Sequence, residues 1–357
     1  MAILAAIGVL ALLIFVHELG HFAAARLQGI RANRFSLGFG PALLKYQGTE
    51  TEYALRAIPL GGYVGFPDDD PESAIAPDDP DLLRNRPLWD RAIVISAGVI
   101  ANLVFAYFLL LGQVATVGVQ EIQPGLVVPK VEVASVAQQG GLEAGDVIVA
   151  LQGQPLENYP EATEQFIEKV KTSVAQPLEL TLKRGEQNLS VTLTPVDDGQ
   201  GQGKIGVALL PNVEQRRAHN PLEAIQYSAS AFERITLLTA QGFGQLITHF
   251  ADSVNQVAGP VKIVEYGASI AQNNAGNLFQ FGALISINLA IINILPLPAL
   301  DGGQLVFLLI EALWGKPLPN KIQDNIMQTG LVLLLGLGVV LIVRDTVNLA
   351  VFQEFFR

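Results

Sequence analysis

The chain has 357 residues, of which 50% are hydrophobic and only 15% are charged, whereas soluble domains carry about 25% charged residues. This composition excludes an ordinary soluble enzyme and a disordered chain, and it predicts a membrane protein. The net charge of -11 and the absence of cysteine exclude a nucleic-acid-binding protein, disulfides and a thiolate metal site. Much of the negative charge lies in residues 67–81, which we interpret as a solvated loop.

Long uncharged runs predict four membrane-spanning helices. The predicted spans are residues 2–27, residues 92–119, a segment that begins near Leu278, and residues 329–343. Pro296 and Pro298 must break the third span, and a shorter apolar helix follows at 303–314.

The basic residues predict the topology of these spans. They flank the first loop (Arg26, Arg31, Arg34, Arg84, Arg86 and Arg91) and lie between the third and fourth spans (Lys316 and Lys321). The positive-inside rule then places both loops in the cytoplasm, and both termini and residues 120–277 on the opposite side.

Residues 120–212 differ in character from the rest of the chain. Their alternating patterns predict strands at 127–133, 178–183 and 188–194 around a helix at 160–172. The segment Gly141 to Ile148 resembles the corresponding turn of a PDZ domain, a fold that binds a peptide or protein end by strand addition. We expect its groove to be bounded by Gly125–Val128 and by Phe166 and Val170.

The residue pattern of the next region, 213–277, predicts an amphipathic helical linker. A helix from Pro221 to Phe250 is expected to lie on the membrane surface and to be ended by Gly259-Pro260. The predicted fold class is therefore an α-helical polytopic membrane protein with an inserted α+β PDZ domain. Residues 1–119 and 278–357 form its membrane domain.

His17-Glu18-Leu19-Gly20-His21 is the strongest chemical signal. Histidines four residues apart project from one face of a helix, about 6 Å apart along its axis, which suits two ligands of one zinc ion. Glu18 would then lie beside the metal-bound water. Ionisable groups inside a span are costly, so three of them on consecutive turns indicate a functional site.

A catalytic zinc site needs a third protein ligand, and no histidine follows closely after His21. His219 and His249 are candidates by residue type, but both lie in the segment predicted outside. Asp301 follows the two prolines at the inner end of the third span. Because the first and third spans run in the same direction, Asp301 is expected at the depth of His17 and His21.

The HELGH helix, the segment Asn293-Ile294-Leu295-Pro296-Leu297-Pro298-Ala299-Leu300-Asp301-Gly302-Gly303 and the PDZ-like region together resemble the site-2 protease family of intramembrane zinc metalloproteases. The chain is most similar to the bacterial regulator-of-sigma-E type, with one PDZ domain instead of two. The resemblance implies Zn²⁺ bound by His17, His21 and Asp301, with Glu18 activating water.

Further motifs extend this resemblance. Gly98-Val99-Ile100-Ala101-Asn102 is similar to a family pattern near the catalytic centre, and residues 37–41 and 51–64, which include Gly61 and Gly62, resemble a membrane-associated β-structure whose edge receives substrate. The resemblance implies substrate contacts at Asn288, Asn293, Pro296 and Pro298. It places Asn102 near the catalytic centre, where we expect a further substrate contact, and by residue type Asn102 is a candidate oxyanion donor. For the asparagines, interhelical hydrogen bonding is an alternative role.

The predicted function is a zinc-dependent endopeptidase that cuts the transmembrane segments of single-span membrane proteins, such as anti-sigma factors or remnant signal peptides. It would lie in a bacterial plasma membrane or a plastid or thylakoid membrane, with its zinc site toward the cytoplasm. A membrane-anchored PDZ adaptor without protease activity is the alternative, but it would have no use for Glu18. The sequence does not contain the motifs of serine or aspartyl intramembrane proteases, so these two classes fit poorly.

Overall fold

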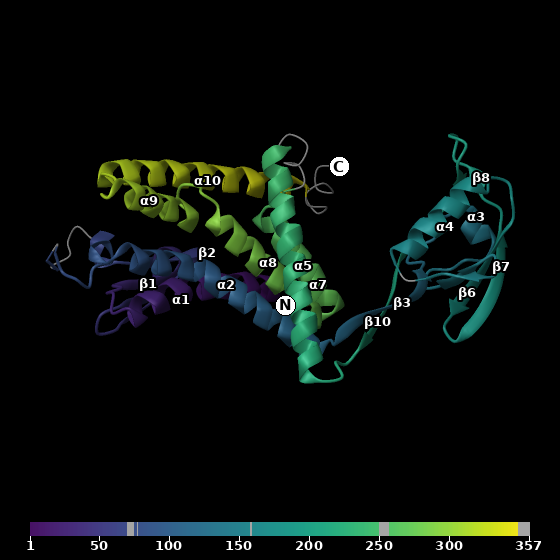
Figure 1. Cartoon of the computed structure of the whole chain (residues 1–357), viewed down its shortest axis with the longest axis horizontal. Coiled ribbons are helices and arrows are strands. Elements are labelled where there is room, and N and C mark those ends of the chain that lie inside the picture. The colour runs from purple at the N-terminus through teal and green to yellow at the C-terminus, as the bar shows by residue number, and fades with distance from the viewer. Residues whose placement is uncertain (70–74, 77, 158, 250–256, 349–357) are drawn as a thin grey trace. The chain divides into compact units, whose positions relative to one another are not determined.

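The computed structural model describes residues 1–69, 75–76, 78–157, 159–249 and 257–348. The chain divides into two compact units (Figure 1), and the second is inserted into the sequence of the first. The first unit combines Met1–Val117 with His219–Arg357, and the second is Gly118–Ala218. The expected PDZ domain, residues 120–212, falls inside the second unit, whereas the expected linker, residues 213–277, mostly belongs to the first.

Among the described residues, four helical segments of the first unit are long and apolar enough to cross a membrane, as predicted: Ala2–Leu27, Leu88–Thr116, Ala275–Ile294 and Asn320–Val347. They correspond to the helices α1 (Ala2–Leu27), α2 (Leu88–Thr116), α8 (Leu278–Ile294, preceded by the short helix η4, Ala275–Asn277) and α10 (Asn320–Asn348). The second and fourth helices begin earlier than predicted, because a helix continues through polar residues that need not lie in the apolar layer.

Helix α2 packs against both α1 and α8. Small residues let α1 and α2 approach closely, since a Cβ atom at Gly20 of α1 would lie 2.5 Å from the carbonyl oxygen of Ala97 in α2. Close backbone approach through small residues is typical of helices that associate within membranes. This packing brings the polar face of α1 against α2.

The predicted break in the third span is present. Helix α8 ends at Ile294, and α9 (Asp301–Trp314) begins directly at Asp301. The connection is tight: Cβ atoms at Gly302 and Gly303 would lie 2.2 Å and 2.4 Å from the carbonyl oxygens of Leu295 and Leu297. Only glycine therefore permits α9 to begin at this point.

The predicted β-structure consists of β1 (Arg34–Gln47) and β2 (Glu52–Gly65), which bend and pair more than once. Phe35 pairs with Val64 on one side and with Tyr53 on the other, and Tyr46 also pairs with Tyr53. Among the described residues, the segment 62–65 of β2 therefore pairs with a strand, residues 34–37, along one edge only. Strand β2 also contacts α1, the helix that carries the histidines.

Two further long helices belong to the first unit. Helix α5 (Pro221–Thr248) begins as predicted, with the Asn220 side chain accepting from the backbone N–H of Glu223. Its predicted end, Phe250, lies outside the described residues. The interpretation of Gly259-Pro260 as a helix end was wrong: Gly259 is the N-cap of α7 (Pro260–Asn273), because proline suits the first turn of a helix, where its missing N–H costs nothing.

Short 3₁₀ turns, η1 (Pro67–Asp69) and η2 (Leu83–Asn85), lie between β2 and α2. The acidic segment here is partly ion-paired. Arg31 pairs with Asp79 and Asp81, while Arg84 pairs with Asp68.

The second unit is an α+β fold with the core residues Leu126, Ile148, Phe166 and Leu180. Its central sheet has the order β10-β3-β4-β6-β7, with β5 paired to β4. The elements are β3 (Val119–Val127), α3 (Val136–Gln139), β4 (Val147–Leu151), β5 (Gln154–Pro155), α4 (Glu161–Thr172), β6 (Leu178–Arg184), β7 (Gln187–Leu193), β8 (Val196–Asp197), β9 (Gly203–Lys204) and β10 (Leu210–Arg216).

The helix predicted at 160–172 and the strands predicted at 178–183 and 188–194 are confirmed as α4, β6 and β7. The strand predicted at 127–133 was wrong. Strand β3 ends at Val127, and beyond it only Val131 forms an isolated bridge, to Val207. An alternating pattern cannot distinguish a continuous strand from two extended segments that face different partners.

The expected peptide groove was also wrong. Leu126 and Val127 pair with β10 on one side and with β4 on the other, so this strand offers no free edge. Phe166 and Val170 are 2% and 7% exposed and belong to the core. A strand with both neighbours in place cannot add a peptide.

Candidate active site

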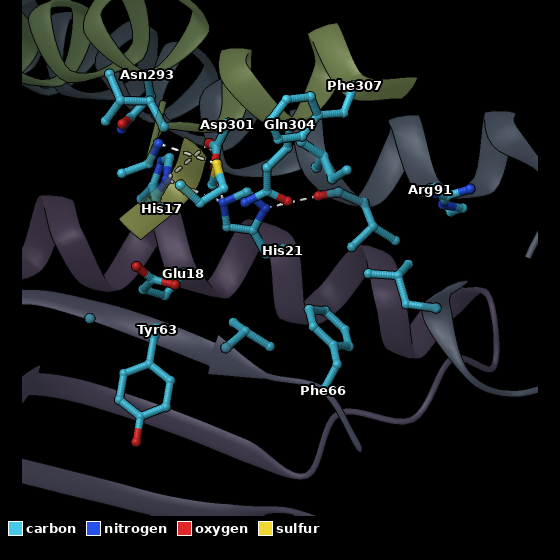
Figure 2. Close-up of a pocket in the computed structure, with 18 of the residues that line it drawn as sticks. His17, Glu18, His21, Tyr63, Phe66, Arg91, Asn293, Asp301, Gln304 and Phe307 are labelled. Carbon is cyan, nitrogen blue, oxygen red and sulfur yellow. Dashed lines mark hydrogen bonds and ion pairs between the residues drawn. The ribbon is translucent and has the colours of Figure 1, made fainter. Parts of the chain in front are cut away.

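Two histidines of α1 and the first residue of α9 converge in the first unit (Figure 2). The two imidazole Nε2 atoms of His17 and His21 lie 3.2 Å apart. Asp301 Oδ2 lies 3.3 Å from Nε2 of His17 and 3.4 Å from Nε2 of His21. Three atoms that can each donate a lone pair to a metal therefore form a nearly equilateral triangle.

This triangle fits a zinc ion. Tetrahedral zinc with bonds of about 2.0–2.1 Å to nitrogen and oxygen separates neighbouring ligand atoms by about 3.3–3.4 Å. Asp301 Oδ2 is also buried without a hydrogen-bond partner among the described residues, which is costly unless a cation satisfies it. The donor set, two imidazoles and one carboxylate, is of the kind found in catalytic zinc sites.

The backbone of α2 holds the His21 ring. Nδ1 of His21 lies 2.8 Å from the carbonyl oxygen of Val94, which can only accept a hydrogen bond. Nδ1 must therefore carry the proton, which leaves the lone pair of Nε2 directed at the triangle. Such a second hydrogen bond is typical of histidines that bind metals.

Asn102, two turns further along α2, lies beside the other histidine. Its Nδ2 is 3.3 Å from Nδ1 of His17, and its Oδ1 is buried without a partner among the described residues. Asn102 is 0% exposed, and the hydroxyl of Ser286 in α8 donates to its backbone carbonyl oxygen over 2.8 Å.

Gly98, between Val94 and Asn102 on α2, makes room for both imidazoles. A Cβ atom at this position would lie 2.3 Å from Nε2 of His21 and 2.7 Å from Cε1 of His17. The sequence motif drew attention to Gly98 but did not show which side chains it faces. Its spacing of four residues before Asn102 was the available signal.

A cavity of about 770 Å³ adjoins the triangle, and its lining includes Glu18, Gly61, Gly62, Asn293 and Asp301. Glu18 lies next to the histidines and toward β2 (Figure 2). A Cβ atom at Gly62 would lie 2.8 Å from Cγ of Glu18, and one at Gly61 would lie 2.4 Å from the Phe39 ring. Gly62 thus brings the backbone of β2 against Glu18, whereas Gly61 makes room for the Phe39 ring.

Only some of the other predicted substrate residues line this cavity. Asn102 and Asn293 line it, whereas Asn288 is half-buried in α8 and is not part of the lining. Pro296 is exposed, and Pro298 packs against Gly330 of α10, where a Cβ atom would lie 2.3 Å from the proline Cβ. His219 and His249 are exposed and lie outside the three-atom cluster.

An ion pair joins α9 to α2, and the sequence did not predict it. Nη1 of Arg91 lies 2.8 Å and 2.9 Å from the two carboxylate oxygens of Glu311. Both side chains are largely buried, and Arg91 also lines the cavity. Because the residues are 220 positions apart, no local pattern connects them. The pair helps to place α9, and with it Asp301.

Comparison with known proteins agrees with this geometry. A Synechocystis sp. protein whose name assigns it to the zinc metalloproteases is 71% identical over 99% of this chain and 97% of its own length. "Membrane metalloprotease ARASP, chloroplastic" of Arabidopsis thaliana is 45% identical over 99% of this chain and 80% of its own length. "Protease RseP" of Yersinia pestis is 30% identical over 98% of this chain and 97% of its own.

Solved structures of PDZ domains are also among the similar proteins. The PDZ domain of the SdrC-like protein from Listeria monocytogenes is 25% identical and covers 26% of this chain and 94% of its own, with a TM-score of 0.22. The model of peptidase family M50 matches residues 5–337. The chain therefore belongs to peptidase family M50, the site-2 protease family that its motifs resemble.

Proposed function

We propose that this M50 peptidase is a zinc-dependent endopeptidase that cuts the membrane-spanning segments of other proteins. The observation that carries the proposal is the triangle of His17, His21 and Asp301, because two of its members lie in a helix long and apolar enough to cross a membrane. The names of the relatives, zinc and membrane metalloproteases, support both the metal and the setting. Membership of a peptidase family favours this function over a PDZ adaptor.

His17, His21 and Asp301 would hold the metal, which supplies Lewis-acid chemistry there: it acidifies a water and polarises the scissile carbonyl. Glu18 lies beside the cluster without belonging to it, so it is placed to take a proton from the attacking water. The same carboxyl group then returns the proton to the leaving amine.

The cavity offers a strand edge to the substrate. A helical substrate hides its amides in its own hydrogen bonds, so it must unfold before it is cut. The segment 62–65 of β2 pairs on one side only, and Gly62 lies against Glu18. Strand addition at this edge would hold the extended substrate beside the base, and Asn293 is placed to contact it.

The distribution of basic residues supports an orientation. Arginines cluster where α1 ends and α2 begins, and His17 and His21 lie nearer the end of α1 than its start. By the positive-inside rule the cluster would lie toward the cytoplasm, or the equivalent plastid compartment, with the second unit on the opposite side.

The second unit is proposed to bind a peptide or protein end along the segment around Val207. The N–H of Ala208 donates to the Lys130 carbonyl, and that of Glu132 donates to the Gly206 carbonyl. In such an antiparallel bridge the N–H and C=O of Val207 itself point away from the partner segment. These groups would pair with an added strand.

Reconstitution in liposomes with a single-span substrate tests the proposal. We expect two products whose new ends, identified by mass spectrometry, lie inside the apolar segment of the substrate. Chelation should stop the reaction and Zn²⁺ should restore it. Cleavage confined to water-exposed segments, or activity indifferent to chelation, would overturn the proposal.

A further inference from the structure

We infer that Asn102 is a positioning residue of the metal site: its carboxamide oxygen accepts a hydrogen bond from Nδ1 of His17 and directs Nε2 of that histidine to the metal. The inference rests on the proposed zinc site. It assigns to Asn102 a role other than the substrate contact or oxyanion donor expected from sequence. The observation behind it is the buried pair formed by Asn102 and Nδ1 of His17.

The chemistry of a metal-bound imidazole requires an acceptor at this place. A histidine that binds zinc through Nε2 carries its proton on Nδ1, and that proton must be donated to a partner. His21 satisfies the requirement with the carbonyl oxygen of Val94, at 2.8 Å. His17 has Asn102 in the equivalent position, at 3.3 Å.

The two ends of the Asn102 carboxamide can exchange places. A half-turn of the amide plane swaps Oδ1 and Nδ2 with little change in shape, and only the hydrogen-bond partners distinguish the two arrangements. In the arrangement described, Oδ1 is buried without a partner, while the amino group faces a ring nitrogen. After the exchange, Oδ1 accepts a hydrogen bond from Nδ1–H of His17, the tautomer that metal binding at Nε2 requires.

The surroundings of Asn102 favour positioning over contact with substrate. Asn102 belongs to the lining of the cavity, but it is 0% exposed, and Ser286, also 0% exposed, holds its backbone from α8. Helix α2 therefore presents three successive groups to the polar face of α1: the Val94 carbonyl, the space at Gly98 and the Asn102 side chain. The Val94 carbonyl and the Asn102 side chain each orient one imidazole, and the space at Gly98 admits both rings.

Zinc affinity of the full-length protein, measured by competition with a chromogenic chelator, tests the inference without using activity. Asn102→Leu keeps the size of the side chain but removes the acceptor, and it should weaken zinc binding about 10–100-fold. Asn102→Asp keeps an acceptor and removes the donor, and it should bind zinc close to the parent level. Co²⁺ substituted for zinc should give a four-coordinate absorption spectrum in the parent and in Asn102→Asp.

Gln113→Leu is the matched control, because it makes a similar change in α2 and removes a buried bond to Gln280 of α8 that does not touch a histidine; its zinc affinity should stay near that of the parent. Parent-like zinc affinity in Asn102→Leu would overturn the inference. So would equal losses in Asn102→Asp and Asn102→Leu, since the amino group would then be the group that matters. If Asn102→Leu does not fold, Asn102→Ala, which also removes the acceptor, takes its place and should show the same loss of zinc affinity. Failure of the zinc site itself is distinguishable, because His17→Ala would then retain zinc.

Discussion

A methyl group on Gly98 would lie 2.3 Å from Nε2 of His21, closer than any non-bonded contact allows. Gly98→Ala should therefore push the imidazoles off the metal and lower zinc affinity by about 10–100-fold, the range for changes that disturb ligand orientation. Gly8→Ala in α1 is the control, since a Cβ atom there meets nothing within 4 Å. Chelator competition measures both variants, and unchanged zinc binding in Gly98→Ala would contradict the geometry.

Glu18→Gln should abolish cleavage while zinc stays bound, because Glu18 is proposed to move a proton and does not belong to the cluster of ligand atoms. General acid–base catalysis contributes about 10²–10⁴-fold to a rate. Cleavage of a single-span substrate and metal content of the same preparation are the two measurements. Glu265→Gln, at an exposed site on α7, removes the same charge and should leave both unchanged. Loss of zinc from Glu18→Gln would argue for a ligand role instead.

Asp301→Ala should lower zinc occupancy, because it removes one of three ligand atoms and leaves two imidazoles alone. His219→Ala and His249→Ala should keep parent zinc content and parent cleavage, since both side chains are exposed and outside the cluster. Metal analysis after gel filtration gives the comparison. Equal zinc content in Asp301→Ala and the parent would refute the three-ligand site.

Acid should loosen the second unit through Asp146. Arg184 donates from Nε and Nη2 to the Asp146 carboxylate over 2.7 Å and 2.9 Å, and these bonds hold the pKa of Asp146 below its usual range. A lowered folded-state pKa stabilises the fold fully above the unfolded value of about 3.9, and the contribution is lost as the pH falls toward the folded-state pKa.

Asp146→Asn should therefore expose peptides of Gly118–Ala218 to faster hydrogen exchange at about pH 6, and its difference from the parent should shrink toward about pH 3. Comparison at matched pH cancels the chemical exchange rate. A difference that is constant across this range would show that the charge of Asp146 does not stabilise the unit.

Removal of the second unit should preserve zinc binding and permit cleavage of substrates that still carry a bulky outer domain. Arg216 pairs with Val119 at the start of β3, so the unit begins and ends at neighbouring points and a short flexible linker can replace Gly118–Ala218. The physical reason is size: if the second unit lies across the membrane from the zinc site, as proposed from the basic residues, it would restrain substrates that still carry a bulky outer domain. If the unit instead delivers new carboxyl ends, the deletion should slow cleavage of trimmed substrate. An unchanged ratio of trimmed to untrimmed cleavage rates would contradict both roles.

Local chemistry made much of this protein predictable from sequence. The four long apolar helices, the break before Asp301 and the elements α4, β6 and β7 follow from hydrophobic runs, prolines and periodicity, which act within a few residues. The pairing of His17 with His21 is likewise a property of one helix. Errors arose where a local signal has two meanings: Gly259-Pro260 suits a helix start as well as an end.

Tertiary structure decided what joins distant parts of the chain. The meeting of Asp301 with the histidines, the space at Gly98 and the pairing of Arg91 with Glu311 depend on how α1, α2 and α9 pack. Tertiary structure also decided the partners of Leu126 and Val127. The sequence predicted a free strand edge there for a peptide, but β10 and β4 occupy both sides. The chain by itself determined which residues can bind a metal; packing between helices determined which atoms reach one another, because a contact across hundreds of residues leaves no periodic trace in the sequence.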